Sequence, residues 1–312
     1  MDNNLLVSII MPAFNAAETV KQAIDSVVAQ TYPNWELVVV DDGSTDSTAD
    51  VVYECTTHDS RIRLITLAIN TGTPGRAKNA ALPHIRGDLV AFLDSDDLWL
   101  PRKLEIQVKR MASREFALCY SGGQYVDTAL ALLSDFVPRY GQGWMFDRLL
   151  AQYEINNQTV IIQRSALLAL QEPYFNPRLM IGEDCDFFMR IARNNNLLGL
   201  PDKLVQYRIL ENSISAIHLD HSHEGLEAVI RWTLNDKELR DRCRHSLRLA
   251  RAKVFFYKAK AAMARGDARV ARAYLFPVMF FGWKFVIVAL ATLAPPLWRL
   301  CLRYGYRGRG HF

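Results

Sequence analysis

Cysteine is scarce in this sequence, and no two cysteines stand close together. The absence of any C-x-x-C pair argues against a zinc site built from such pairs. The odd number and the wide spacing of the cysteines are typical of a protein kept in a reducing compartment. The five residues are Cys55, Cys119, Cys185, Cys243 and Cys301.

The first residues also lack the marks of a secretory leader. The stretch MDNNLLVSIIMP has neither a basic start nor a small-residue cleavage site. Together with the cysteine pattern, this leads us to expect that the catalytic part of the chain lies in the cytoplasm.

Glycine-rich loops that grip phosphates are missing as well. No G-x-G-x-x-G follows the first apolar run, which argues against a dinucleotide-binding fingerprint. A nucleotidyltransferase that makes sugar nucleotides would be expected to carry a glycine-rich, basic loop at this point. The segment 13–17, AFNAA, contains neither glycine nor a basic residue, and this counts against that class of enzyme.

Charge is abundant, but it is divided unevenly along the chain. Residues 1–235 carry 20 Lys and Arg against 29 Asp and Glu, a net charge of −9. Residues 236–312 carry 17 Lys and Arg against 4 Asp and Glu, a net charge of +13. Acidic groups can gather a metal or act as acids and bases, whereas a basic tail tends to meet anionic surfaces such as phospholipid or nucleic acid.

Short apolar runs alternate with segments of helical periodicity in the first hundred residues. Such runs are typical of strands buried on both faces, and the alternation predicts parallel strands joined by right-handed helical crossovers. We therefore expect an α/β fold with a mostly parallel, Rossmann-like sheet. The expected strands are Val7–Met11, Leu37–Val40, Ile62–Leu67 and Leu89–Leu93, with a helix over Ala17–Gln30 after the first of them.

The pattern is looser after about residue 100. An amphipathic helix is expected over Phe187–Arg193, after the segment Gly182-Glu183-Asp184, and a last short strand over Tyr207–Ile209. Residues 220–272 have the pattern of helices rich in Arg and Lys.

The stretch Ala273–Trp298 is strongly apolar. It is long enough for a membrane-spanning helix, which needs roughly 20 apolar residues. However, Lys284, Pro277 and Pro295-Pro296 interrupt it, and basic residues flank it on both sides. These features favour a segment associated with the cytoplasmic face of a membrane. The alternative is a buried helix that packs on the catalytic domain.

Polar segments follow the expected strands at the point where each strand ends. In parallel sheets, ligands bind beyond the carboxyl ends of the strands, where the segments that follow neighbouring strands converge. The sequence therefore predicts one ligand-binding crevice at this edge of the sheet. The segments are Ala13–Asn15, Asp41-Asp42, Asn70–Asn79 and Asp94–Asp97.

The acidic tetrad Asp94-Ser95-Asp96-Asp97 is the most telling of these segments. Nearby carboxylates repel one another unless a cation lies between them. Mg²⁺ typically combines one or two carboxylates with substrate phosphates. We therefore expect a metal that bridges protein and diphosphate and neutralises the charge on a leaving nucleoside diphosphate. The alternative is a solvated turn or a helix cap.

Four segments, taken together and in this order, resemble family 2 of the inverting glycosyltransferases, which has the GT-A fold. The resemblance covers roughly residues 5–215. It implies transfer of a sugar from a nucleotide-diphosphate donor in a single displacement that inverts the anomeric centre. The segments are Val7–Asn15, Val38–Asp46, Asp94–Asp97 and Glu183-Asp184.

The resemblance implies a role for each matching position on the donor side. One residue of the pair Asp41-Asp42 would accept the N3–H of a uracil-like base; we favour Asp42, although the sequence does not separate the two. Arg76 would contact the donor, or it is an ordinary surface arginine. The residues expected to hold the nucleoside are Pro12, Ala13, Phe14, Asn15, Asp41 and Asp42.

The same resemblance implies the groups that hold the diphosphate and perform the chemistry. Asp94 and Asp96 would form the nucleotide-sugar motif, with Asp96 and Asp97 nearest to a Mn²⁺ or Mg²⁺ ion. Glu183 would lie on the substrate side. Asp184 would be the catalytic base, or it merely caps the following helix.

Two positions depart from the family pattern. Cys185 stands where an aromatic residue often follows Glu-Asp, and Leu210 stands where a histidine is common after Tyr-Arg-Ile. Neither change removes a proposed catalytic carboxylate, but both put the acceptor side in doubt. Trp99, just after the tetrad, either lines the acceptor path or belongs to the core.

These observations divide the chain into three expected parts. Residues 1–218 would form the GT-A catalytic domain, with nucleotide-sugar binding in about 5–100 and acceptor binding in about 101–218. A basic helical segment, 219–272, and an apolar tail, 273–312, would follow.

We expect a UDP-sugar donor and a glycan or lipid-linked acceptor at the inner face of the cell membrane, in the synthesis of cell-surface polysaccharide or glycoconjugate. The alternatives are a nucleotidyltransferase and a non-catalytic sugar-nucleotide-binding module at the membrane. Nucleic acid is not expected as a partner, because the basic tail mixes its charge with a long apolar stretch.

Overall fold

The computed structural model describes residues 4–210, 213, 217–281, 290, 292 and 298. Most of the expected apolar segment Ala273–Trp298 therefore lies outside the described residues. The chain forms two compact units. The first comprises Met1–Met145, Ile155–Arg178 and Arg190–Leu210, and the second comprises Phe146–Glu154, Leu179–Met189 and Glu211–Phe312.

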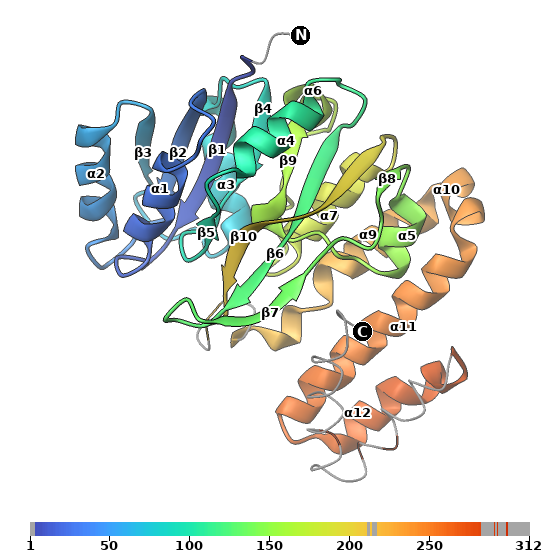
Figure 1. Cartoon of the computed structure of the whole chain (residues 1–312). Helices are drawn as coiled ribbons and strands as arrows, with labels where there is room; N and C mark the ends of the chain where they lie inside the picture. The colour runs from blue at the N-terminus through green and yellow to red at the C-terminus, as the bar shows by residue number, and fades with distance from the viewer. Residues whose placement is uncertain are drawn as a thin grey trace. The chain divides into compact units, whose positions relative to one another are not determined.

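The first unit is built on a single sheet, which has ten strands among the described residues (Figure 1). Its order is β3-β2-β1-β4-β9-β6-β10-β5, with β7 beside β6 and β8 beside β10. The strands are β1 (Val7–Ala13), β2 (Trp35–Asp41), β3 (Ile62–Thr66), β4 (Leu89–Phe92), β5 (Leu98–Trp99), β6 (Leu118–Val126), β7 (Leu132–Phe136), β8 (Gln142–Gly143), β9 (Ile161–Gln163) and β10 (Leu197–Arg208).

The half of the sheet formed by β1 to β4 is entirely parallel, as the alternating pattern predicts. Its crossovers run through helices α1 (Val20–Val28), α2 (Thr48–His58) and α3 (Pro74–Ala81). Strands β1 and β2 are apolar almost throughout because both faces are covered. Ile9 and Met11 pack in the cluster that contains Ile24 of α1, while Ile10 is buried outside that cluster.

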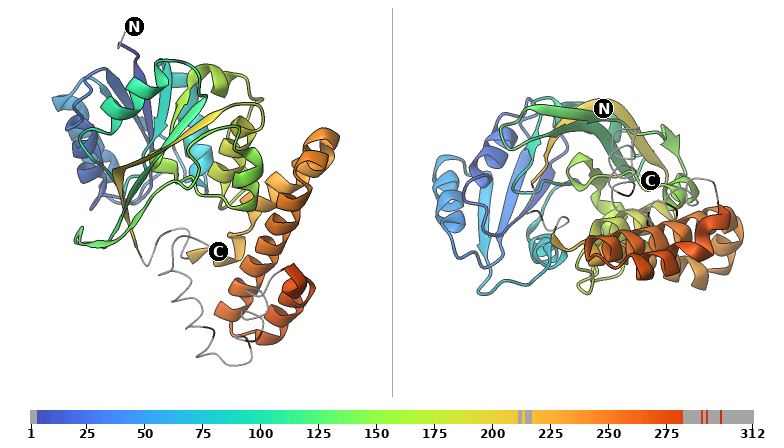
Figure 2. Two further views of the ribbon diagram at one scale, coloured as in Figure 1. Left: turned by 45° about the vertical axis from the view of Figure 1, so that its right-hand side comes forward. Right: turned by 90° about the horizontal axis from the view of Figure 1, so that it is seen from below.

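The other half of the sheet is mixed. Strand β9 is antiparallel to both β4 and β6, while β6 and β10 run parallel. Figure 2 shows the sheet curling from the blue strands at one edge towards the yellow β10. Helix α4 (Lys103–Met111) packs Leu104 and Val108 into the main core, and a short 3-10 turn, η2 (Asn157–Thr159), precedes β9.

One expected strand is much longer than the sequence indicates. The predicted short strand Tyr207–Ile209 is the end of β10, which begins ten residues earlier at Leu197. Its first part, Leu197–Leu200, is buried, but Pro201, Asp202 and Lys203 are exposed and the pairing with β6 shifts there. This polar interruption hides the continuity of the strand in the sequence.

The second unit is helical in the part that the structure describes. Its long helix α11 (Arg244–Ala264) lies beside α12 (Ala268–Leu275) (Figure 2). The two helices pack against each other with small side chains, among them Ala259 and Ala271. Asp267 caps α12 by accepting a hydrogen bond from Val270 N at 3.0 Å. The unit also contains α5 (Phe146–Ala151), most of α7 (Glu183–Ala192), η3 (Leu219–His221), α9 (Glu224–Asn235), α10 (Lys237–Arg242) and η4 (Phe276–Phe281).

The C-terminal helical region expected from the sequence is thus confirmed. Within the described residues, no helix combines the length and the apolar character required to cross a membrane.

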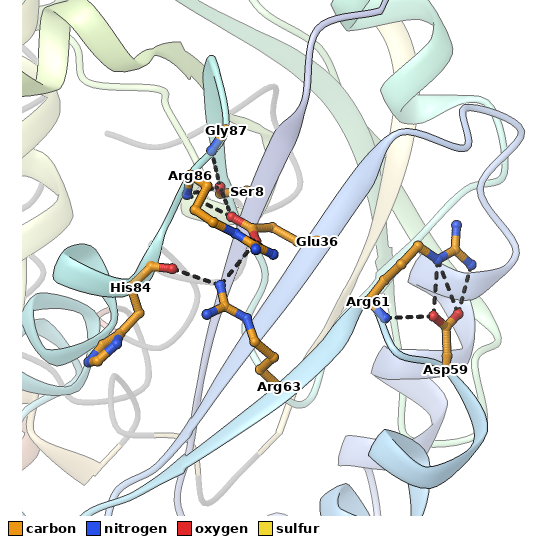
Figure 3. A network of polar contacts seen from close by, with 8 residues as sticks. All are labelled: Ser8, Glu36, Asp59, Arg61, Arg63, His84, Arg86 and Gly87. Atoms are coloured by element: carbon orange, nitrogen blue, oxygen red, sulfur yellow. Dashed lines mark hydrogen bonds and ion pairs between the residues drawn. The ribbon is translucent and has the colours of Figure 1, made fainter.

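A buried carboxylate ties the beginnings of four strands together (Figure 3). Glu36 of β2 is 2% exposed, and its Oε1 accepts from Ser8 Oγ at 2.6 Å and from Arg86 N at 2.7 Å. Its Oε2 accepts from the guanidinium groups of Arg86 and Arg63 at 2.7 and 3.0 Å. Gly87 N donates to Ser8 Oγ at 2.7 Å, so the turn before β4 joins the same network.

These contacts decide the charge state of Glu36. Burial alone would raise its pKa, but the hydrogen bonds from Ser8 and Arg86 outweigh burial and lower the pKa below its ordinary value. A carboxylate with a depressed pKa stabilises the fold above its unfolded pKa, near 4.3, and this contribution is lost as the pH falls through the folded pKa.

We expect Glu36→Gln to lower the free energy of unfolding by about 1.5–3 kcal/mol at neutral pH, because charge-assisted hydrogen bonds are lost. Urea unfolding at a series of pH values measures the difference, which should shrink as the pH drops below about 4. The exposed Glu54→Gln is the control and should change little. A penalty for Glu36→Gln that is the same at every pH would contradict this account.

Candidate functional site

The carboxyl ends of β1 and β2 meet in register. Pro12 lies opposite Val40, and Ala13 lies opposite Asp41. The backbone N–H of Asp42 then donates to Ala13 O at 2.8 Å, which continues the pairing beyond the end of β2. The residues expected to hold a nucleoside are therefore brought together by the sheet itself.

The loop that follows β1 is held by the loop that follows β2. Asn15 adopts a left-handed backbone (φ 48°), and its N–H donates to Ser44 Oγ at 3.0 Å. In return, Thr45 N donates to Asn15 Oδ1 at 2.8 Å. Phe14 is 45% exposed between these contacts, so an aromatic ring is available to solvent beside the paired loops.

Asp41 and Asp42 are both buried but have different partners. Asp42 accepts from Thr71 N and from Thr71 Oγ1, each at 2.9 Å. Asp41 Oδ1 accepts a longer bond of 3.4 Å from Ser44 N. Burial raises the pKa of Asp42, and the charge of Asp41 contributes in the same direction. Which of the two contacts a base stays a prediction.

Arg76 lies on α3, next to this pair. Its side chain is exposed, its Nη1 donates to Thr71 O at 2.8 Å, and its Nε donates to Pro177 O at 3.1 Å. The guanidinium also lowers the pKa of Asp42 through its charge. Arg76 is thus anchored to the segment that holds Asp42, which places a fixed positive charge near the expected donor position.

The acidic tetrad forms a tight turn directly after β4. Asp97 N donates to Asp94 O at 3.1 Å, and Asp97 Oδ1 accepts from Arg208 N at 2.7 Å. Burial raises the pKa of Asp96 to about 6, helped by the charge of Asp94. Burial, with Asp96 and Asp94, raises the pKa of Asp97 well above its ordinary value. The turn therefore brings three carboxyl groups together, and two of them, Asp96 and Asp97, bind a proton more tightly than usual.

Two partners of this turn were not expected from the sequence. Asn157 Nδ2 donates to Asp94 Oδ1 at 3.0 Å. Arg208 is 5% exposed, its Nη2 donates to Gln22 Oε1 at 2.8 Å, and its charge lowers the pKa of Asp96 and Asp97. The signals in the sequence were the place of Arg208 in an expected strand and in the Tyr-Arg-Ile segment that resembles the family pattern.

The donor set of this turn fits a cation that is shared with a substrate. Among the residues that the structure describes, no group of three or more His, Cys, Asp and Glu is arranged to hold a metal ion. A protein-only cage is therefore not formed there. Mg²⁺ and similar cations, however, are commonly bound by one or two carboxylates together with substrate phosphates. Asp96 and Asp97, the pair expected to lie nearest to the ion, would supply that number of carboxylates, and one oxygen of Asp97 also accepts from the backbone N–H of Arg208.

Glu183 and Asp184 belong to the second unit. They lie in the first turn of α7, which begins four residues before the expected start at Phe187. Gly182 (φ 82°) precedes this turn, and a Cβ there would lie 2.8 Å from the Cα of Gly225. The backbone contact between the two glycines therefore holds the start of α7. Asp186 accepts from Trp232 Nε1 at 3.1 Å.

Comparison with known proteins decides the family. The model of the family described as "Glycosyl transferase family 2" matches residues 8–160. WfgD of Escherichia coli, a UDP-Glc:alpha-D-GlcNAc-diphosphoundecaprenol beta-1,3-glucosyltransferase, is 35% identical over 216 residues, 69% of this chain and 81% of its own. The chain belongs to glycosyl transferase family 2.

A second relative of this family 2 glycosyltransferase is also a glycosyltransferase. TuaG of Bacillus subtilis, a putative teichuronic acid biosynthesis glycosyltransferase, is 33% identical over 212 residues, 68% of this chain and 82% of its own.

Two solved structures confirm the GT-A fold. S. aureus TarS 1–349 in complex with UDP-GlcNAc has a TM-score of 0.64 at 17% identity and covers 99% of this chain and 93% of its own. The mannosyltransferase PcManGT from Pyrobaculum calidifontis, in complex with GDP-Man and Mn²⁺, has a TM-score of 0.63 at 19% identity, covering 96% and 84%.

The raised pKa of Asp96 gives a testable consequence. Because the folded state holds the proton more tightly than the unfolded state, ionised Asp96 destabilises the fold as the pH rises from about 4 to 6. We expect Asp96→Asn to increase the free energy of unfolding by about 1–3 kcal/mol at pH 7.5, and to have little effect below about pH 4. Urea unfolding in EDTA measures this.

The exposed Asp202→Asn serves as the control and should leave stability unchanged at both pH values. If Asp96→Asn fails to stabilise the protein at pH 7.5, then burial and the charge of Asp94 do not raise the pKa of Asp96 in the folded state.

Proposed function

We propose that this glycosyltransferase moves a sugar from a UDP-sugar to a glycan or lipid-linked acceptor, with inversion, in the synthesis of cell-surface polysaccharide or glycoconjugate. One observation supports this most directly. The carboxylates that end β2 and the acidic turn that follows β4 flank β1 on the same edge of the sheet. Strands in a sheet are about 4.8 Å apart, so β2 and β4, which lie on either side of β1, are about 10 Å apart. That separation suits the two ends of a nucleotide diphosphate.

On the donor side, the proposal gives each group one task. Pro12 to Asn15 and the pair Asp41-Asp42 hold the nucleoside, and Arg76 contacts the donor. Asp94 and Asp96 hold the sugar and the diphosphate. Asp96 and Asp97 lie nearest to a Mn²⁺ or Mg²⁺ ion, which when bound would neutralise charge on the leaving nucleoside diphosphate.

On the acceptor side, Asp184 takes the proton from the attacking hydroxyl, and Glu183 lies beside it. A sugar hydroxyl is a weak nucleophile at neutral pH, so removal of its proton during attack speeds the transfer. Asp184 lies in the first turn of α7 together with Glu183 and Asp186, near the partially positive N-terminus of the helix.

The names of the relatives support the donor and acceptor classes. WfgD is described by a UDP-Glc donor and a diphosphoundecaprenol acceptor, and TuaG by teichuronic acid biosynthesis. TarS was solved with UDP-GlcNAc, whereas PcManGT was solved with GDP-Man. A UDP-sugar is therefore our first choice, and GDP-mannose is the competing donor that an experiment must include.

A lipid-linked acceptor requires the enzyme to work at a membrane face, and the helices of the second unit supply a basic surface for this. Arg244, Arg248 and Arg251 are exposed on α11 and, at this spacing, share one side of the helix. Arg265 near the end of α11, with Arg269 and Arg272 on α12, is exposed as well. Such clusters are attracted to anionic lipid on the cytoplasmic leaflet.

The proposed function predicts donor-dependent turnover. With Mn²⁺ and a panel of acceptors that includes diphosphoundecaprenol-linked sugars, the protein should release nucleotide and transfer sugar from one of UDP-glucose, UDP-GlcNAc and GDP-mannose. In the same assay, Asp184→Asn should lower kcat by about 10²–10⁴-fold with donor binding retained, because only the proton acceptor is lost.

Asp50→Asn is the matched control, since Asp50 is an exposed acidic residue in the first turn of α2. Transfer by Asp184→Asn at the wild-type rate would overturn the assignment of the base. Donor binding without any transfer across the panel would favour a non-catalytic binding module.

Membrane association can be tested separately. Changing Arg244, Arg248 and Arg251 together to Gln should weaken binding to vesicles rich in phosphatidylglycerol by about 1 kcal/mol per residue, or about 100-fold in all. Vesicle sedimentation measures this. The control is the same change at the exposed residues Arg102, which precedes α4, and Lys109 and Arg110 of α4. Equal binding by both triple variants would contradict a membrane surface on α11.

A further inference from the structure

The acidic turn is supported by a buried polar network that lies outside the residues assigned to the donor. The turn η2 is fully inside the first unit: Asn157, Gln158 and Thr159 are 6%, 1% and 0% exposed. Three consecutive buried polar residues are costly unless their polar groups are paired. The hydrogen-bond partners of η2 therefore indicate which part of the structure this turn supports.

Two long side chains hold the backbone of η2. Trp99 Nε1 donates to Gln158 O at 2.9 Å, and Gln107 Nε2 donates to Thr159 O at 2.8 Å. Trp99 is 3% exposed and belongs to the main core. Of the two roles that the sequence left open for it, the acceptor path and the core, the structure shows the core. Both carbonyl groups are thus tied to rigid parts of the first unit.

Gln107 is itself held by Lys103, one turn earlier on α4. Lys103 Nζ donates to Gln107 Oε1 at 2.7 Å and lies 4.1 Å from the centre of the Trp99 ring. Lys103 and Gln107 are both 0% exposed. Because the oxygen of the Gln107 amide is occupied by Lys103, its NH₂ group is directed to Thr159 O. The network therefore has one fixed arrangement.

At its other end, the network reaches the acidic turn through a single side chain. Asn157 Nδ2 donates to Asp94 Oδ1 at 3.0 Å, whereas Asn157 Oδ1 is buried and has no hydrogen-bond partner among the described residues. Within that part of the chain, the carboxylate of Asp94 is the group that orients this amide. A carboxylate accepts but does not donate, so the NH₂ group must face it.

We propose that Asn157 is a positioning residue for Asp94: it holds one carboxylate oxygen so that the carboxylate faces the donor sugar in a single orientation. The network of Trp99, Gln107 and Lys103 keeps Asn157 in place. This inference rests on the proposed function, because it assigns a role to Asn157 through the donor-binding role of Asp94. Groups that orient a binding carboxylate typically contribute about 10–100-fold to affinity or activity.

The first test uses Asn157→Ala in the transfer assay. The value of kcat/KM for the donor should fall about 10–100-fold. Asn157→Asp keeps the volume of the side chain but places a second carboxylate against Asp94, so it should fall at least as far. Asn156→Asp is the matched control, because it adds the same charge one residue earlier. Asn156 contacts Thr159 through its backbone oxygen, which the substitution leaves in place.

The decisive test is a double-mutant cycle with Asp94→Asn. If Asn157 acts through Asp94, then Asn157→Ala should reduce kcat/KM by less than about threefold in the Asp94→Asn background, since coupled residues are not additive. A merely structural role would give the same reduction in both backgrounds, and this result would overturn the proposal. Should Asn157→Ala fail to fold, Asn157→Asp replaces it in the cycle.

The outcomes separate this inference from the function on which it rests. A wild-type protein that neither binds nor turns over any donor in the panel would overturn both. An active wild-type protein, together with an Asn157→Ala variant of equal kcat/KM, would overturn the positioning role alone.

Discussion

Burial of several carboxylates close together at one edge of the sheet is the constraint on which the site depends. Parallel strands place the residues that follow them at a common edge, and here those residues are Asp41, Asp42 and the turn that contains Asp94, Asp96 and Asp97. Burial makes the repulsion worse, because it removes the water that would screen these charges. Burial is the largest cause of the raised pKa values of Asp42, Asp96 and Asp97, and the charges of neighbouring carboxylates act in the same direction.

A buried carboxylate at the opposite ends of the same strands, away from the candidate site, has a different environment. Glu36 is buried as deeply as Asp97, yet its pKa is lowered, because Ser8 and two arginines satisfy it. Among the described residues, the buried Arg208 and the amide of Asn157 contact the acidic turn. The pKa of the buried carboxylate is thus lowered at one edge of the sheet, while those of the acidic turn are raised at the other, and raised pKa values are common at functional sites.

Much of the fold, and the meeting of the acidic segments at one edge of the sheet, could be predicted from the sequence, because the signals there are local. The apolar runs of β1, β2 and β4 and the acidic residues after them need no knowledge of distant parts. The start of α7 was misjudged, because Glu183 and Asp184 carry no apolar periodicity. Asn157 and Arg208 were missed for a different reason. They contact Asp94 and Asp97 across 63 and 111 residues of sequence, and only packing brings such residues together.

The contact between Gly182 and Gly225 constrains where α7 can begin. A Cβ at Gly182 would lie 2.8 Å from the Cα of Gly225, and a Cβ at Gly225 would lie 2.3 Å from Gly182 O. A side chain at either position would therefore displace the turn that carries Glu183 and Asp184. The placement of these two carboxylates thus depends on two residues that have no side chain.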